Sequence, residues 1–185
     1  MRHLIGITGR ARAGKDTAAR YLAEQFNMAH RAFAHPLKLI TSVLAGEPLG
    51  NFHDDVLKEQ HCPALGMTRR KAMQLVGTEM VRKHFGPDVW SRLLIDKWRS
   101  HGCPPTVVSD VRFNNEAQAI RAAGGVIVRI TRPGEGLVGE AATHESEQGV
   151  SNYLVDFDIP NNGSRAELFC HLSELMAILE GVQHG

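Results

Sequence analysis

The chain has 185 residues, of which 43% are hydrophobic, and its formal net charge at pH 7 is +1. A chain of this length is expected to fold as one α/β domain with a core of its own. The near-neutral charge argues against a nucleic-acid partner, because a dedicated binder would carry an excess of basic residues. No apolar stretch is long enough to span a membrane, and no signal-peptide segment opens the chain, so we expect a cytoplasmic protein without a membrane partner.

The first predicted element is a buried strand, residues 4–7, which leads directly into a glycine-rich loop. The loop has the pattern G-x-x-x-x-G-K over residues 9–15, and apolar residues at helical spacing follow it. In the order strand, loop, helix, this pattern binds phosphates: backbone N–H groups and the helix N-terminus attract the anion, and Lys15 reaches the β- and γ-phosphates. The sequence therefore predicts a nucleoside triphosphate site. Its predicted contacts in the loop are Arg12, Ala13, Gly14, Lys15, Asp16 and Thr17.

Asp16 departs from the common form of this loop, in which Ser or Thr follows the lysine and coordinates Mg²⁺. A carboxylate beside a triphosphate is repelled, unless a metal ion lies between them or the carboxylate turns into the positive field of the helix start. Contact with Mg²⁺ and helix capping therefore both stay open for Asp16. We expect Thr17 to donate its hydroxyl to a phosphate oxygen.

Strands and helices are predicted to alternate along the rest of the chain. The predicted strands are residues 29–34, 106–109, 126–130 and 156–159. The predicted helices run from Pro36 to about Leu44, from a Thr68 cap to about His84, from beyond Pro87 to Trp98, from an Asn114 cap to Gly124, and from the capping box Ser164-x-x-Glu167 onward. Residues 45–68 are predicted to be irregular, and the glycine-rich residues 133–150 a mobile lid. Repeated strand–helix units predict a parallel sheet flanked by helices, with ligands at the carboxyl ends of the strands.

A second candidate site follows the strand 106–109, where this rule places ligand groups. Asp110 can hold Mg²⁺ through water or orient the acceptor oxygen, and Arg112 can bind a phosphate. The alternative is a turn aspartate paired with a nearby arginine. Glu116 lies one turn into the next helix and either contacts substrate or interacts favourably with the helix dipole. The metal candidates are Asp16, Thr17 and Asp110.

A third candidate site is a polar stripe on the predicted helix 68–84. Every fourth residue is polar, at Arg70, Gln74, Thr78 and Arg82. Met73, Val76 and Met80 lie on another face and are expected in the core. A solvated face is the ordinary explanation for such a stripe. Two arginines that flank an amide and a hydroxyl also suit a base and a monophosphate, and periodicity alone does not decide between the two.

Taken together, these motifs resemble those of the phage-type deoxynucleoside monophosphate kinases of the P-loop kinase superfamily, over nearly the whole chain. The resemblance is carried by Gly-Lys-Asp-Thr at 14–17, Phe-Ala-His-Pro-Leu-Lys at 33–38, Gln-Leu-Val-Gly-Thr-Glu at 74–79, Asp-Val-Trp at 88–90, Ser-Asp-Val-Arg-Phe at 109–113, Arg-Pro-Gly at 132–134, Thr-His-Glu-Ser-Glu at 143–147 and Asn-Asn-Gly-Ser at 161–164. Residues 45–68 carry none of it.

The resemblance implies that ATP, with Mg²⁺, donates its γ-phosphoryl group to a deoxynucleoside 5′-monophosphate. It implies one P-loop kinase domain over 1–185, with an acceptor-binding helical region at about 36–100 and a lid at about 133–150. The implied catalytic residues are Lys15, Asp110, Arg112 and Arg132. Asn161 and Gly163 are implied near the adenine of ATP. The implied acceptor contacts are Lys38, Arg70, Gln74, Thr78, Arg82, Trp90, Arg112, Glu116 and His144, with Trp90 as a stacking wall.

Two alternatives remain beside this hypothesis. One is another P-loop small-molecule kinase, similar to phosphomevalonate kinase or dephospho-coenzyme A kinase. The other is a nucleotide-binding module without turnover. The accepted bases, the preference for deoxyribose, the role of residues 45–68 and the oligomeric state, a homodimer included, stay open.

Overall fold

The computed structural model describes residues 3–134 and 149–182. The chain divides into two compact units, Phe33–Leu94 and the remainder, Met1–Ala32 with Ile95–Gly185. We call the larger one the sheet unit and Phe33–Leu94 the helical unit, and describe each by itself. The helical unit overlaps much of the range 36–100, for which an acceptor-binding role stays a prediction.

The sheet unit is built on five parallel strands in the order β2-β5-β1-β6-β7. Their bounds are β1 Leu4–Thr8, β2 Ala29–Arg31, β5 Thr106–Val108, β6 Val126–Thr131 and β7 Phe157–Pro160. β1 lies in the middle, so its residues are buried on both faces, as the apolar sequence Leu-Ile-Gly-Ile predicts. The parallel sheet flanked by helices is confirmed. β2 ends earlier than predicted because the next helix already begins at Ala34.

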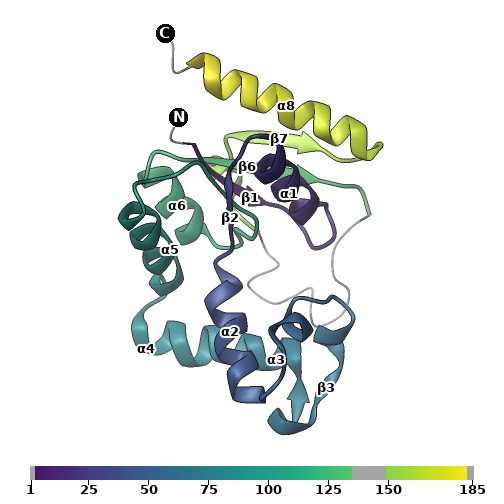
Figure 1. The fold of residues 1–185 in the computed structure, drawn as a ribbon, viewed down its shortest axis with the longest axis vertical. Helices are drawn as coiled ribbons and strands as arrows, with labels where there is room; N and C mark the ends of the chain where they lie inside the picture. The colour runs from purple at the N-terminus through teal and green to yellow at the C-terminus, as the bar shows by residue number, and fades with distance from the viewer. Residues whose placement is uncertain (1–2, 135–148, 183–185) are drawn as a thin grey trace. The chain divides into compact units, whose positions relative to one another are not determined.

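Helices cover both faces of this sheet (Figure 1). α1 (Lys15–Gln25) and α8 (Arg165–Val182) pack together over the face to which Ile5 and Ile7 point, and form the main core there. α6 (Asn114–Ala122) lies on the other face, where the Ile120 side chain fills the space beside Gly6. The remaining elements are α5 (Val89–Ser100), which continues from the helical unit, and the short η6 (Asn152–Leu154).

The starts of α6 and α8 are capped differently. Ser164 and Glu167 form the predicted capping box, because Ser164 N–H donates to Glu167 and Glu167 N–H donates to the Ser164 hydroxyl. The prediction that Asn114 caps α6 is wrong. Asn114 is the first helical residue, and its side chain exchanges two hydrogen bonds with Ser151 instead, both of 2.9 Å.

The helical unit is made of short elements around a small core. Their bounds are α2 Ala34–Ala45, η1 Leu49–Phe52, η2 Leu57–Glu59, β3 His61–Cys62, η3 Pro63–Leu65, β4 Met67–Thr68, α3 Arg69–Gln74, η4 Leu75–Arg82 and α4 Lys83–Phe85. The region 45–68 thus consists of single 3₁₀ turns and a two-residue antiparallel pairing, β3 with β4. Phe52 and Cys62 are fully buried and pack with Met73 from α3.

An ion pair between the buried Arg69 and the half-buried Glu47 fixes the irregular region to α3. Arg69 is 8% exposed and donates through two nitrogens to the Glu47 carboxylate, at 2.5 and 2.9 Å. Its third guanidinium nitrogen donates to the carbonyls of Leu57 and Gln60. One guanidinium therefore satisfies acceptors from three places in the irregular region, which explains how a segment with little regular structure is held in a defined position.

The helix predicted over 68–84 is present, but its central part is a π-helix. Thr68 caps α3 by accepting from Lys71 N–H, and the helical path runs on through η4 and α4 to Phe85. In η4 the hydrogen bonds reach one residue further than in an α-helix, which turns later side chains to a different face. The prediction that Met80 belongs to the core is wrong, since Met80 is 50% exposed whereas Val76 is 5% exposed.

Across the described residues, no helix combines the length and the apolar character needed to cross a membrane.

Candidate functional site

The phosphate-binding loop joins β1 to α1 and lies against two other parts of the sheet unit. Gly9 and Gly14 both have positive φ, at 137° and 101°. A Cβ at position 9 would collide with the Ile130 carbonyl of β6, and one at position 14 would collide with the Asn161 amide. Glycine is required at both positions because the loop backbone passes so close to its neighbours.

The Lys15 ammonium lies over the loop itself. It donates to the Gly9 carbonyl at 2.8 Å and to the Arg10 carbonyl at 2.7 Å. These contacts hold the cation at the mouth of the loop, where phosphate oxygens would compete for the same protons. Arg10 and Arg12 are exposed beside it, and Arg12 has a left-handed backbone with φ of 65°.

The strand ends bring the other predicted catalytic residues to the same edge of the sheet. Gly6 in β1 is paired with Val108 in β5, and Val111 N–H donates to the Ile7 carbonyl, so the segment 110–112 runs beside the end of β1. Arg132 directly follows β6 and is exposed. Asn161 follows β7, and its N–H donates to the Thr131 carbonyl. The carboxyl edge of the sheet therefore gathers the loop, Asp110, Arg112, Arg132 and Asn161.

Glu116 is buried in the first turn of α6, with 3% of its surface exposed. Its carboxylate accepts from Arg112 N–H at 2.9 Å and from Phe113 N–H at 3.2 Å. The observed role of Glu116 is therefore to cap the helix that carries it. A direct contact between Glu116 and substrate stays a prediction.

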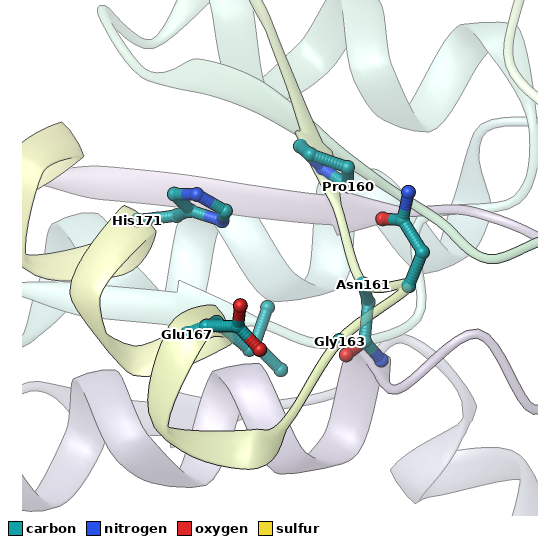
Figure 2. Close-up of a pocket in the computed structure, with 7 residues that line it drawn as sticks. Pro160, Asn161, Gly163, Glu167 and His171 are labelled. Carbon is teal, nitrogen blue, oxygen red and sulfur yellow. The ribbon is translucent and has the colours of Figure 1, made fainter.

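A cavity of about 320 Å³ lies between the loop that follows β7 and the first two turns of α8. Figure 2 shows the side chains that surround it, with those of Pro160 and Asn161 on one side and those of Glu167 and His171 on α8. Asn161 is 8% exposed and donates from its amide to the Ala13 carbonyl at 2.8 Å. One residue thus both lines the cavity and holds the phosphate-binding loop.

The polar groups of this cavity suit a neutral heteroaromatic ring better than a phosphate. Hydrogen bonds from the Ser164 backbone and hydroxyl lower the pKa of Glu167, which keeps its carboxylate ionised and repels anions. The Nδ1 atom of His171 has no hydrogen-bond partner within the described part of the chain. The sequence interpretation named Asn161 and Gly163 here but missed Glu167 and His171. Glu167 of the capping box and His171 are four residues apart and so lie on one face of the helix. This spacing could have identified the pair from the sequence.

In the helical unit, the acceptor candidates are half-buried and several have protein partners. Arg70, Gln74, Thr78 and Arg82 are all half-buried, whereas the residues one position later, Lys71, Leu75, Glu79 and Lys83, are all exposed. The stripe is therefore not the outermost face of this helix. Arg70 forms an ion pair with Glu59 at 2.5 Å, and Lys38 lies 3.3 Å from the Nδ1 atom of His53.

Trp90 and His144 are two further predicted acceptor contacts. Trp90 is 5% exposed, and its indole N–H donates to the Gly77 carbonyl at 3.3 Å in η4. The ring is a core side chain against the π-helical turn. Its role as a stacking wall for the acceptor stays a prediction. His144 and most of the predicted lid, 133–150, lie outside the described residues.

Oxygen ligands for a magnesium ion are available in the sheet unit. Asp16 is exposed in the first turn of α1, Thr17 follows it half-buried, and Asp110 is half-buried beyond β5. Carboxylate and hydroxyl oxygens are the donors that Mg²⁺ prefers, together with phosphate oxygens and water. This donor set fits a magnesium ion carried in with a nucleotide. Among the described residues, no cluster of three or more His, Cys, Asp or Glu side chains is placed to hold a metal.

Similarity to known proteins extends over most of the chain. The deoxynucleotide monophosphate kinase family matches residues 49–172. A putative deoxynucleotide monophosphate kinase of Acanthamoeba polyphaga mimivirus is 31% identical over 194 residues, which cover 91% of this chain and 93% of that protein. The deoxynucleotide monophosphate kinase of Enterobacteria phage T4 is 32% identical over 114 residues, which cover 60% of this chain and 46% of that protein.

Solved structures of P-loop kinases have the same fold. A dephospho-CoA kinase from Campylobacter jejuni matches with a TM-score of 0.57 and 16% identity, over 99% of this chain and 100% of that chain. A shikimate kinase from Aquifex aeolicus matches with a TM-score of 0.53 and 14% identity, over 97% and 98%. At such identities the likeness concerns the fold, and it confirms the predicted P-loop kinase architecture.

Proposed function

Because this chain belongs to the deoxynucleotide monophosphate kinase family and is therefore a phosphotransferase, we propose that it transfers the γ-phosphoryl group of ATP to a deoxynucleoside 5′-monophosphate. The product is the diphosphate. The observation that carries the proposal is the phosphate-binding loop at a sheet edge that also holds Asp110 and Arg112. A donor site and groups for a second phosphate thus occur side by side in one unit.

ATP binds in the sheet unit. The loop amides and Lys15 hold its β- and γ-phosphates, and Lys15 exchanges the carbonyls of Gly9 and Arg10 for phosphate oxygens. The cavity beside Asn161 and Gly163 receives the adenine, because it is large enough for a base and its ionised Glu167 disfavours phosphate. Asn161 lines the cavity and also contacts the loop, so this one residue borders both the proposed base site and the proposed phosphate site.

Two polyanions must be brought together in this reaction, so the protein contributes position and positive charge. Arg112 and Arg132 stand at the sheet edge and bind the phosphates that react. Asp16, Thr17 and Asp110 are the residues that would hold a magnesium ion, which would neutralise negative charge on the nucleotide phosphates. Asp110 would orient the acceptor oxygen or help to hold the magnesium ion through water.

The acceptor nucleotide binds through the helical unit. Lys38, Arg70 and Arg82 are the cations proposed for its phosphate, in the half-buried positions where such contacts are least weakened by water. Gln74 and Thr78 lie between the two arginines on the same stripe and contact the base or sugar. His144 keeps its proposed acceptor role, and the location in the cytoplasm and homodimerisation stay predictions.

Release of ADP in the presence of acceptors tests this function against its alternatives. Purified protein with ATP and Mg²⁺ is given each deoxyribo- and ribonucleoside monophosphate in turn. We expect ADP release that depends on a deoxynucleoside monophosphate. ADP release that only phosphomevalonate or dephospho-coenzyme A elicits would identify another P-loop kinase, and no turnover with any acceptor would favour a binding module.

A further inference from the structure

Glu116 lies at the junction between the sheet edge and α6, in the segment that carries two proposed catalytic residues. β5 ends at Val108, α6 begins at Asn114, and Asp110 and Arg112 stand in between. The carboxylate of Glu116 reaches back from the first turn of the helix to this segment. It accepts from Arg112 N–H at 2.9 Å and from Phe113 N–H at 3.2 Å.

This contact is buried and charged, which makes it strong. Glu116 is 3% exposed, and a buried carboxylate is tolerated only where hydrogen-bond donors surround it. Hydrogen bonds from N–H groups to an ionised oxygen are about twice as strong as neutral ones, and the helix N-terminus adds favourable charge. The N-cap residue is Phe113, whose side chain cannot accept a hydrogen bond, so the carboxylate is the polar half of this cap.

The other side of the segment is fixed as well. Val111 N–H donates to the Ile7 carbonyl of β1. The backbone from 111 to 113 is therefore held between the strand that precedes the phosphate-binding loop and the carboxylate of Glu116. These backbone contacts set the position from which the Arg112 side chain extends relative to that loop.

We propose that Glu116 is a positioning residue, which holds the backbone of Arg112 so that its guanidinium is already in place when the acceptor phosphate arrives. The proposal rests on the proposed function of Arg112. In this proposal Glu116 acts through Arg112, and a contact of its own with substrate is not required. Misplacement of a charged group by about 1 Å is enough to cost up to about 10²-fold in rate, so a contact with the backbone of Arg112 has consequences for turnover.

Three substitutions separate positioning from substrate contact. Glu116→Ala removes the oxygen that accepts both hydrogen bonds, and we expect kcat to fall by about 10- to 100-fold at saturating ATP, with the KM for ATP unchanged. Glu116→Gln keeps an oxygen that accepts from the Arg112 and Phe113 N–H groups and should recover most of kcat. Glu116→Asp withdraws the carboxylate by one methylene and should fall between them.

A double-mutant cycle with Arg112→Ala gives the decisive result. If Glu116 acts through Arg112, Glu116→Ala should cost little more once Arg112 is already alanine. Additive losses, or a Glu116→Gln variant as impaired as Glu116→Ala, would overturn positioning. An Arg112→Ala variant with unchanged acceptor kinetics would instead refute the function proposed for Arg112, so the two failures are distinguishable.

Asp156→Ala is the matched control. Its carboxylate also accepts a backbone N–H, from Ile127 at 2.8 Å, but at the opposite end of β6 from Arg132. We expect this variant to lose stability and keep kcat per folded molecule. Thermal unfolding of every variant at the assay pH establishes the folded fraction. If Glu116→Ala does not fold, the Gln and Asp variants and their cycles with Arg112→Ala carry the test.

Discussion

Lys15, the proposed catalytic cation, lies against the backbone of its own loop. Its ammonium donates to two carbonyls of the loop, those of Gly9 and Arg10. A carbonyl is a weaker partner for a cation than a phosphate oxygen, so the exchange on nucleotide binding is favourable. In the proposed reaction we expect the lysine to stabilise charge that develops between the β- and γ-phosphates.

Lys15→Ala should therefore lower turnover by at least about 10²-fold, because it removes charge stabilisation in the transition state. Arg20→Ala is the matched control, as it removes an exposed cation from the same helix. Steady-state kinetics beside thermal unfolding measure both effects. A folded Lys15→Ala variant with near-native phosphoryl transfer would contradict the assignment of this loop.

Individual residues were predictable from the sequence where their chemistry is local. The glycines, Lys15 and the box at Ser164 and Glu167 are fixed by short motifs whose geometry hardly depends on the rest of the chain. Asn114 was misassigned because a capping side chain has an alternative partner 37 residues away, at Ser151. For Trp90 the sequence alone does not distinguish a core position from a binding wall, since an aromatic side chain fits either one.

The irregular region of the helical unit depends on the Glu47–Arg69 ion pair. Hydrogen bonds from the Arg69 guanidinium, with a further one from Asn51, lower the pKa of Glu47 from 4.5 to about 2. A carboxylate whose folded pKa lies below its unfolded pKa binds fewer protons in the folded state. Its stabilisation is complete above about pH 4.5 and is lost as the pH falls toward 2.

Glu47→Gln should thus make the protein less stable at pH 7, and the difference from the native chain should shrink between about pH 5 and pH 2. Urea unfolding followed by tryptophan fluorescence measures this. Trp98→Phe in both proteins leaves Trp90, of the helical unit, as the reporter. A stability difference that stays constant across this pH range would show that the ion pair is not the cause.

The direction in which the polar stripe faces is set by the whole helical path from Arg69 to Phe85. Arg70→Ala and Arg82→Ala should each lower kcat/KM for the acceptor by about 2–4 kcal/mol, with the KM for ATP unchanged. Gln74→Ala should cost less and change the ranking among bases, since an amide discriminates by matching donors and acceptors.

Lys71→Ala and Lys83→Ala are the controls for the stripe, as they remove exposed cations next to the two arginines. Kinetics with acceptor varied at saturating ATP, and the reverse, compare all five variants. Equal effects of the arginine and lysine substitutions would make the stripe an ordinary surface. The acceptor contacts proposed for the stripe would then be refuted.

Helices could be predicted from the sequence where the repeat of apolar and polar residues extends over several turns. The helix over 68–84 was found within a residue or two, but a 3.6-residue period cannot reveal that η4 is a π-helix, and so Met80 was placed on the wrong face. The elements between 45 and 68 are two to four residues long, too short for any period to show. Their positions come from the contacts of Arg69.

At the scale of the whole molecule, the parallel sheet followed from the alternation of strands and helices, and the P-loop kinase fold is confirmed. The phosphate-binding loop belongs to the sheet unit and the polar stripe to the helical unit. We expect side chains of the helical unit to select the accepted base, and the sequence offers no motif that identifies which base this is.

Phosphoryl transfer from ATP to a nucleoside monophosphate is tested most sharply by following the phosphoryl group itself. ATP labelled in the γ-phosphate is incubated with Mg²⁺, a deoxynucleoside monophosphate and the protein, and the nucleotides are separated. We predict label in the β-phosphate of the deoxynucleoside diphosphate with the native chain, and little or none with Lys15→Ala. Label recovered only as inorganic phosphate, at a rate that does not depend on the monophosphate, would contradict the account.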